Sequence, residues 1–334
     1  MKALDWHEGE FSRLIAHRST LPHALLVRGI RGIGKLAFVR ALAQALLCES
    51  PATGGSACGA CNPCAWFDAG AHPDYRQIEP ADVADAADAD SGEKKARLIP
   101  VEQIRALSDF IGLSAHQSGP KVIVIHPAEL LNLSAGNALL KSLEEPPPRT
   151  LFLLVTHRPQ QVLPTIKSRC QQVALPAPNA ATAEAWLAAQ GIHEPARALA
   201  HTGNAPLLAV ELAQSGYWGT RAAFLRQLTA ADLDPLAVAE ASRDFPVPQV
   251  VSLLQKWSYD LVYFRAMGKV RYNPDHADAI ARIALPLDRL AGARFHREMV
   301  GLQRIVHHPL NARLFLAQLL FAYRDLVQGR PSAV

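Results

Sequence analysis

The segment from His23 to Ala37 constrains the fold of this chain more than any other stretch. A short apolar run, Ala24 to Val27, predicts a buried strand, and apolar residues at helical spacing predict a helix from about Lys35 to Leu47. The turn between them carries the candidate phosphate-binding residues Gly29, Gly32, Gly34 and Lys35. Glycines let backbone N–H groups close around a phosphate, and the N-terminus of the helix adds positive potential. The segment therefore predicts a phosphate-binding loop between a strand and a helix.

One position departs from the full pattern of such loops. That pattern has Ser or Thr after the lysine, where the hydroxyl holds Mg²⁺, and this chain has Leu36. Because a leucine side chain cannot bind a metal, we expect a loop that has kept its shape and lost its metal ligand. A glycine-rich turn that binds no nucleotide is the alternative from this segment alone.

The length and composition describe an ordinary globular protein. A chain of 334 residues has room for two or three domains, and hydrophobic residues make up 49% of it against 19% charged. The net charge of +4 is too small to argue for nucleic-acid binding by itself. No apolar run approaches the roughly 18 residues of a membrane helix, and the N-terminus lacks the apolar region of a signal peptide. We therefore expect a cytoplasmic protein.

Four of the five cysteines are clustered with the spacing C-x9-C-x2-C-x2-C. In a cytoplasmic protein this favours a metal site over disulfides. Sulfur ligands must converge within about 4 Å of one another, which two overlapping C-x2-C pairs allow. We predict a closed, structural Zn²⁺ site formed by Cys48, Cys58, Cys61 and Cys64. A redox pair, chance clustering and an iron–sulfur cluster are the alternatives.

Strands that alternate with helices predict a parallel α/β sheet in the N-terminal part of the chain. The apolar runs 121–125 and 151–155 are typical of buried parallel strands, and a further short strand is expected within 72–79.

Helices are expected at 8–18, from Pro100 onward and at 135–145, where Ser134 would be the N-cap. Residues 81–97 are rich in Ala, Asp, Glu and Lys, which predicts a solvated insertion.

From about Pro176 helical periods replace the strand runs. The last helix is expected to begin near Pro309 and to carry an apolar face formed by Leu310, Leu314, Ala317 and Phe321, with Phe315 and Leu319 beside it. So broad an apolar surface suits a buried helix or a subunit interface.

The residues after the strand 121–125 bear on hydrolysis. In a P-loop ATPase that strand ends in an Asp that supports Mg²⁺, followed by an acidic residue that activates water. Here the two positions are His126 and Pro127, and Glu129 comes two residues too late. Together with Leu36, these residues predict that the fold was retained while hydrolysis was lost.

Three segments resemble the clamp-loader AAA+ family: Asn137–Pro147, Thr156 and Ile166–Cys170. The four-cysteine insert is typical of its bacterial members, and His308–Phe315 is similar to their collar region. The resemblance implies an AAA+ core over 1–175 with a zinc module at 48–64, a small helical lid domain over 176–212 and an all-α collar domain over 213–334. It also implies that Thr156 is a sensor-like residue of the nucleotide site.

The intact glycines with altered metal-site residues are more similar to a non-hydrolysing clamp-loader subunit than to the ATP-hydrolysing gamma/tau subunit. The resemblance implies no intrinsic ATPase, weak or absent ATP binding, and a stator that places Arg169 in trans, as an arginine finger, against ATP held by a neighbour. The implied partners are the gamma/tau and delta subunits of a hetero-oligomer and, through it, the sliding clamp and primer–template DNA. That complex belongs to the DNA polymerase III holoenzyme, a nucleotidyltransferase of DNA replication.

Two other functions are weighed against this one. An active clamp-loader ATPase is disfavoured by Leu36, His126 and Pro127. A zinc-dependent nucleic-acid-binding module is disfavoured by the modest net charge and by the lack of a clustered basic and aromatic stripe.

Overall fold

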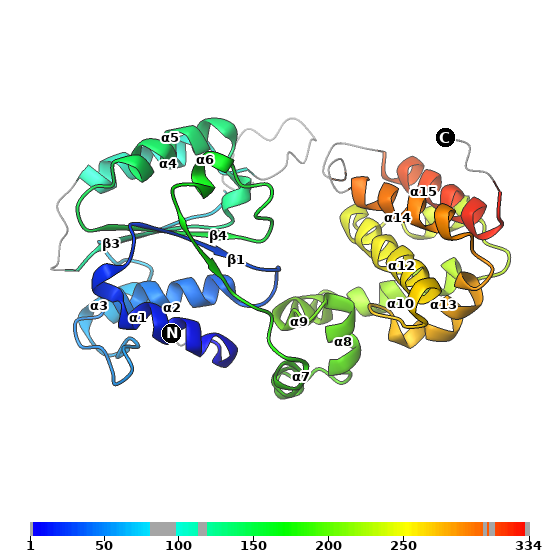
Figure 1. Ribbon diagram of the computed structural model, residues 1–334, viewed down its shortest axis with the longest axis horizontal. Helices are drawn as coiled ribbons and strands as arrows, with labels where there is room; N and C mark the ends of the chain where they lie inside the picture. The colour runs from blue at the N-terminus through cyan, green and yellow to red at the C-terminus, as the bar shows by residue number, and fades with distance from the viewer. Residues whose placement is uncertain (1–2, 81–97, 113–118, 303–305, 307–310, 331–334) are drawn as a thin grey trace. The chain divides into compact units, whose positions relative to one another are not determined.

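A computed structural model describes residues 3–80, 98–112, 119–302, 306 and 311–330. These residues divide into two compact units, with the boundary between Pro178 and Asn179. The first unit contains the sheet and the second is helical (Figure 1). The insertion expected at 81–97 lies outside the described residues. The division at 175 and 212 into three domains stays a prediction.

Five parallel strands form the sheet of the first unit, in the order β2-β3-β4-β1-β5. Their bounds are β1 Ala24–Arg28, β2 Tyr75–Ile78, β3 Lys121–Ile125, β4 Thr150–Thr156 and β5 Gln171–Ala174. Every residue of β3 and β4 is buried, as the continuous apolar runs predict for central parallel strands. Because β1 lies between β4 and β5, the glycine loop that follows it emerges beside the ends of both strands.

Helices cover both faces of this sheet, with α1–α3 on one face and α4–α6 on the other (Figure 1). The first group comprises η1 Asp5–His7, α1 Glu8–Ala16, η2 Arg18–Thr20, α2 Lys35–Leu47 and α3 Asn62–Asp68. The second comprises α4 Val101–Gly112, η4 Ala128–Leu130, α5 Leu133–Glu144 and α6 Pro164–Lys167. Ile104 and Leu107 of α4 join Leu139 of α5 in one apolar cluster with the strand residues Ile123 and Leu154.

The predicted cap of α5 is wrong by two residues. Asn132, not Ser134, precedes the helix, and its side-chain oxygen accepts a hydrogen bond from the Ala135 amide at 2.7 Å. Asn132 has the extended backbone of an N-cap, whereas Ser134 already lies inside the helix. Both residue types favour capping, so the sequence alone did not decide between them.

Strand β5 was not predicted from the sequence. Only Val173 of its four residues is buried, because β5 is an edge strand that lacks the apolar run of β3 and β4.

The helices of the second unit are α7 Ala180–Ala189, α8 Pro195–Thr202, α9 Pro206–Gln214, α10 Tyr217–Leu228, α11 Pro235–Ala241, α12 Val247–Met267, η5 Pro274–His276, α13 Ala277–Ala284, α14 Arg289–Gly301 and α15 Ala312–Val327. A small apolar cluster joins α7, α8 and α9 around Leu187 and Leu199. A larger one joins α10 to α15 around Trp257 and Leu320. Trp218 packs against both clusters.

The last helix begins later than predicted, and its buried face is different. Asn311 caps it by accepting a hydrogen bond from the Leu314 amide at 3.1 Å, and Leu310 lies outside the described residues. Leu314, predicted on the apolar face, is 65% exposed. The buried residues are Leu316, Ala317, Leu319, Leu320 and Tyr323. Tyr323 orients this face, because its hydroxyl oxygen accepts a hydrogen bond from the buried Trp257 indole at 3.0 Å.

Candidate functional site

The glycine loop after β1 has the backbone that its glycines predict. Gly32 and Gly34 have φ values of 82° and 95°, which side chains rarely adopt. Gly29 is required for another reason: a Cβ there would lie 2.7 Å from the carbonyl oxygen of Leu175. Because Gly29 has no side chain, the end of β1 can lie close to the segment after β5, whether or not a phosphate binds.

The side chain of Lys35 donates hydrogen bonds to the glycine loop itself. Its ammonium nitrogen lies 2.8 Å from the carbonyl oxygen of Gly29 and 2.5 Å from that of Ile30. The side chain is buried, and this burial lowers the pKa of Lys35 to about 8, although the carboxylate of Glu129 acts in the opposite direction. The lysine that would hold a phosphate thus has carbonyl partners already.

A chain of polar contacts runs through His126, the residue predicted to replace the first acid of an ATPase. His126 lies with Nδ1 2.9 Å from the Glu79 carboxylate and with Nε2 3.2 Å from Nε2 of His157. Because the carboxylate only accepts, Nδ1 of His126 donates to it, and Nε2 of a neutral His126 accepts from His157. Burial and nearby cations, Lys35 first among them, lower the pKa of His157 to about 3, which keeps that ring neutral.

The sequence did not indicate which group the side chain of Glu129 contacts. Its carboxylate accepts a hydrogen bond from the backbone amide of His157, at 3.0 Å and 3.3 Å to the two oxygens. The 3-10 turn η4 brings it there in spite of its late position in the sequence. The carboxylate thus supports the backbone after β4, and its charge raises the pKa of Lys35 against the effect of burial.

The predicted sensor residue Thr156 is completely buried at the end of β4. Its hydroxyl accepts a hydrogen bond from the Arg158 amide at 3.1 Å, which shapes the turn after the strand. The structure places Thr156 opposite Arg28 of β1, so it does lie next to the strand that leads into the glycine loop.

The four clustered cysteines converge in space. Their Sγ atoms lie within 4.8 Å of one another, with separations of 3.6 Å for Cys48–Cys58, 3.8 Å for Cys48–Cys61 and 4.0 Å for Cys58–Cys64. Sulfurs at about 2.3 Å from a tetrahedral zinc ion would be roughly 3.8 Å apart, so the set fits that ion.

Backbone amides support the sulfur atoms of this cluster. Cys58 Sγ accepts hydrogen bonds from the amides of Ala60 and Cys61 at 3.4 Å and 3.3 Å. These donors favour the thiolate and lower the pKa of Cys58 to about 6. The end of α2 and the start of α3 bring the four residues together, so the predicted metal-binding module is a continuation of the glycine-loop helix.

Arg169 follows the short helix α6 and is one-third exposed. Its Nη2 lies 2.5 Å from the Glu144 carboxylate, and Nη1 donates to the Thr165 carbonyl oxygen at 3.0 Å. The next residue, Cys170, is buried in the apolar cluster below α5 and α6, and burial raises the pKa of its thiol to about 11. Cys170 therefore anchors this segment in the apolar cluster and is separate from the four clustered cysteines.

The chain is similar in sequence to known proteins. The sequence model of a family described as "DNA polymerase III, delta subunit" matches residues 10–179. A Pseudomonas aeruginosa protein named DNA polymerase III subunit delta′ is 39% identical over 278 residues, which cover 81% of this chain and 78% of that protein. The chain belongs to the DNA polymerase III subunit delta′ family.

Three further proteins are similar to this chain. The Escherichia coli delta′ subunit is 33% identical over 226 residues, covering 66% of this chain and 64% of that protein. The tau subunit of the same organism is 37% identical over 155 residues, covering 46% of this chain and 22% of tau. A solved gamma subunit-related protein from Thermotoga maritima covers 96% of this chain and is itself covered to 99%, with 17% identity and a TM-score of 0.42.

Membership in the delta′ family confirms the resemblance carried by residues 137–147, Thr156 and 166–170. The structure confirms the predicted parallel α/β core with an inserted four-cysteine module, followed by helices. Among the described residues, no helix is both long enough and apolar enough to cross a membrane.

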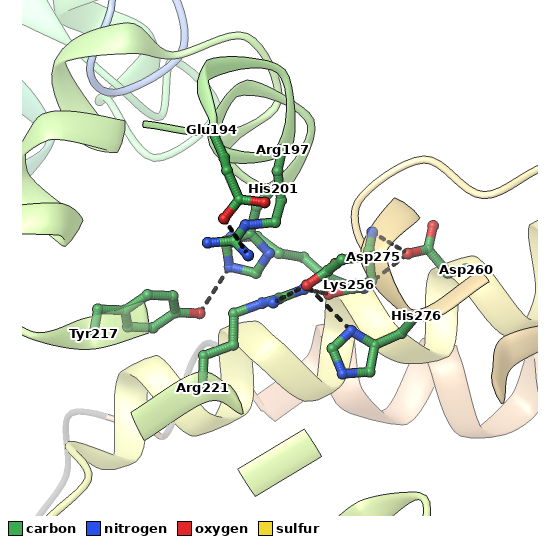
Figure 2. Close-up of polar contacts among 10 residues, drawn as sticks. Glu194, Arg197, His201, Tyr217, Arg221, Lys256, Asp260, Asp275 and His276 are labelled. Carbon is green, nitrogen blue, oxygen red and sulfur yellow. Dashed lines mark hydrogen bonds and ion pairs between the residues drawn. The ribbon is translucent and has the colours of Figure 1, made fainter. Parts of the chain in front are cut away.

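A second polar cluster of this delta′ family member lies in the helical unit, where sequence reasoning named no site (Figure 2). Arg221 of α10 donates two hydrogen bonds to Asp275, at 2.7 Å and 2.9 Å, and one to Asn273 at 2.8 Å. Buried Asp260 of α12 accepts from the amides of residues 271, 272 and 273. These bonds connect α10 and α12 through the loop before α13.

His201 connects α8 to the same cluster (Figure 2). Its Nε2 lies 2.7 Å from the Tyr217 hydroxyl and 3.4 Å from the Lys256 ammonium nitrogen. Because an ammonium group only donates, Nε2 is the acceptor and the ring proton lies on Nδ1. Arg221 is paired with the Asp275 carboxylate and Asp260 accepts from backbone amides, so these two buried ions join helices of the unit.

Proposed function

We propose that this chain is a non-hydrolysing stator subunit of a DNA polymerase III clamp loader. The single observation that carries the proposal is the replacement of the two hydrolytic acids by His126 and Pro127, with His126 bonded to Glu79 and His157. Leu36 supplies no ligand for Mg²⁺, and Lys35 donates to its own loop. A site arranged in this way has neither a metal position nor a base that would activate water.

The four cysteines would hold one structural Zn²⁺ ion. Four thiolates at tetrahedral spacing leave no open position for a substrate, so the ion would stabilise the module between α2 and α3 and take no part in a reaction. Backbone N–H groups at Cys58 support the charge of the bound thiolates.

Arg169 would act on ATP held by a neighbouring gamma/tau subunit. A guanidinium keeps its charge at all working pH values and presents a planar set of donors, which suits a phosphoryl group during transfer. Retention of this exposed arginine in a chain with no hydrolytic acids makes sense when the nucleotide belongs to another subunit.

The remaining parts of the proposal follow from this role. The helices within residues 213–334 would form the collar that assembles with gamma/tau and delta subunits. The assembled complex would act in the cytoplasm, where it would open the sliding clamp and load it on primer–template DNA. Hydrolysis would then belong to the gamma/tau neighbours alone.

The test is a reconstituted clamp loader that carries Arg169→Ala. We expect normal assembly, with a several-fold loss of the ATPase activity stimulated by DNA and clamp and of clamp loading. Arg169→Lys should rescue poorly, because a point charge lacks the guanidinium fork. Arg105→Ala, which removes an exposed arginine of α4, is the matched control. Wild-type loading rates with Arg169→Ala would show that the trans role is wrong.

A further inference from the structure

Glu144 holds the guanidinium of Arg169 within the free chain. Its carboxylate lies 2.5 Å from Nη2 of Arg169. On the other side, Nη1 donates to the Thr165 carbonyl oxygen at 3.0 Å and to the Ser168 hydroxyl at 3.3 Å. Both terminal nitrogens of Arg169 therefore have partners in their own chain. These are the nitrogens that would donate to two phosphoryl oxygens.

The base of the arginine is fixed while its tip has room to move. Ile166 and Cys170, on either side of it, are buried in one apolar cluster. The Arg169 amide donates to the Ile166 carbonyl oxygen at 3.1 Å. The side chain itself remains 33% exposed, so a change of partner requires only rotation of the side chain.

The position of Glu144 argues for a role beyond helix stability. It is the last residue of α5, where the negative end of the helix dipole disfavours a carboxylate. Its side chain is 49% exposed, so water screens the ion pair, and such pairs shift an equilibrium by only about two- to five-fold. A pair of this strength is readily exchanged for a phosphate that carries more charge.

We propose that Glu144 is a positioning residue for Arg169, which holds the guanidinium until phosphoryl oxygens of a nucleotide on a neighbouring subunit displace the carboxylate. This inference rests on the proposed trans role of Arg169. It predicts that Glu144 competes with the nucleotide, so its removal strengthens engagement of Arg169 with ATP without supplying any catalytic group.

The first test uses the isolated chain and is independent of the trans role. Phenylglyoxal modifies accessible arginines, and mass mapping of the peptide with Arg169 gives its rate of modification. Glu144→Gln should raise that rate about two- to five-fold. The matched control is Glu145→Gln, since the adjacent Glu145 is exposed and forms no ion pair within the described residues. Equal rates in the wild type and both variants would overturn the inference while leaving the trans role of Arg169 intact.

The second test uses the reconstituted clamp loader. Glu144→Gln should lower the KM for ATP in stimulated hydrolysis about two- to five-fold with little change in kcat, and Glu145→Gln should change neither. The KM effect must vanish when Arg169→Ala is present, because a purely structural role of Glu144 would not depend on that arginine. An unchanged KM, or a KM effect that survives Arg169→Ala, contradicts the inference. Full activity of Arg169→Ala alone would instead remove the proposed function on which it rests.

Discussion

The ammonium nitrogen of Lys35 lies 2.8 Å from the carbonyl oxygen of Gly29, so the lysine of the phosphate loop donates to the loop itself. A nucleotide would have to replace this bond and the contact with Ile30, and it would find no hydroxyl at Leu36 for its Mg²⁺. The ammonium group of Lys35 therefore stabilises the conformation of its own loop.

The first prediction concerns nucleotide binding. We expect calorimetry of the isolated chain with Mg-ATP to give weak or undetectable binding, and we expect no steady turnover. Leu36→Thr restores only one of the missing metal-binding groups, so it should not restore hydrolysis while His126 and Pro127 remain. Sub-micromolar binding of Mg-ATP by the wild-type chain would contradict the prediction of weak binding. Sustained phosphate release would contradict the prediction that the chain does not hydrolyse ATP.

The second prediction concerns the metal. Purified protein should contain one zinc ion per chain by elemental mass spectrometry. Cys58→Ser should lose most of it and lower the thermal stability of the core unit, because binding free energy of the closed site contributes to folding. The fifth cysteine provides the control: Cys170 is buried away from the cluster, so Cys170→Ser should keep the full zinc content. Wild-type protein without stoichiometric metal would refute a structural zinc site.

The third prediction concerns the ion pair of Arg221 and Asp275. The Arg221 side chain is 2% exposed, and Arg221→Met would leave a carboxylate and an amide without their donor. We expect a loss of about 3 kcal/mol in the free energy of unfolding of the helical unit, measured by urea denaturation. Arg243→Met is the control, since Arg243 is 68% exposed in its contacts with Glu240 and Asp244, and it should cost under about 0.5 kcal/mol. Similar losses for the two variants would contradict this assignment.

The fourth prediction concerns acid sensitivity at His201. Burial, assisted by Lys256 and Arg221, lowers the pKa of His201 to about 2, below its ordinary value of 6.5. The unfolded chain therefore binds a proton that the native chain excludes, and stability falls as pH drops below about 6.5. At about pH 5 this residue should account for a loss of about 2 kcal/mol relative to neutral pH.

Replacement of this histidine provides the measurement. His201→Gln should reduce the difference in unfolding free energy between neutral pH and about pH 5 by that amount, even though it lowers stability at both. The exposed His193→Gln shows the effect of replacing a histidine outside the cluster. An unchanged pH difference in His201→Gln would show that the buried ring is not the origin of the acid sensitivity.

The sequence by itself determined the features that depend on local pattern. Continuous apolar runs identified β3 and β4, because a central parallel strand must be apolar on both faces. The glycines predicted a tight loop, in which Gly32 and Gly34 have positive φ, and the cysteine spacing predicted that four sulfur atoms converge. The interpretation of Leu36, His126 and Pro127 as altered metal-site residues rests on the order of residues alone and stays a prediction.

Only the tertiary structure decided which distant groups meet. Edge strand β5 has no apolar run, and its place is set by pairing with β1. Glu129 looked misplaced in sequence, yet a 3-10 turn puts its carboxylate on the His157 amide. The pairing of Glu144 with Arg169, and that of Arg221 with Asp275, joins residues that are 25 and 54 positions apart. Sequence periodicity predicts which residues of one helix or strand are buried. Ion pairs such as these depend instead on how separate helices and strands pack, because that packing fixes the positions of the charged groups.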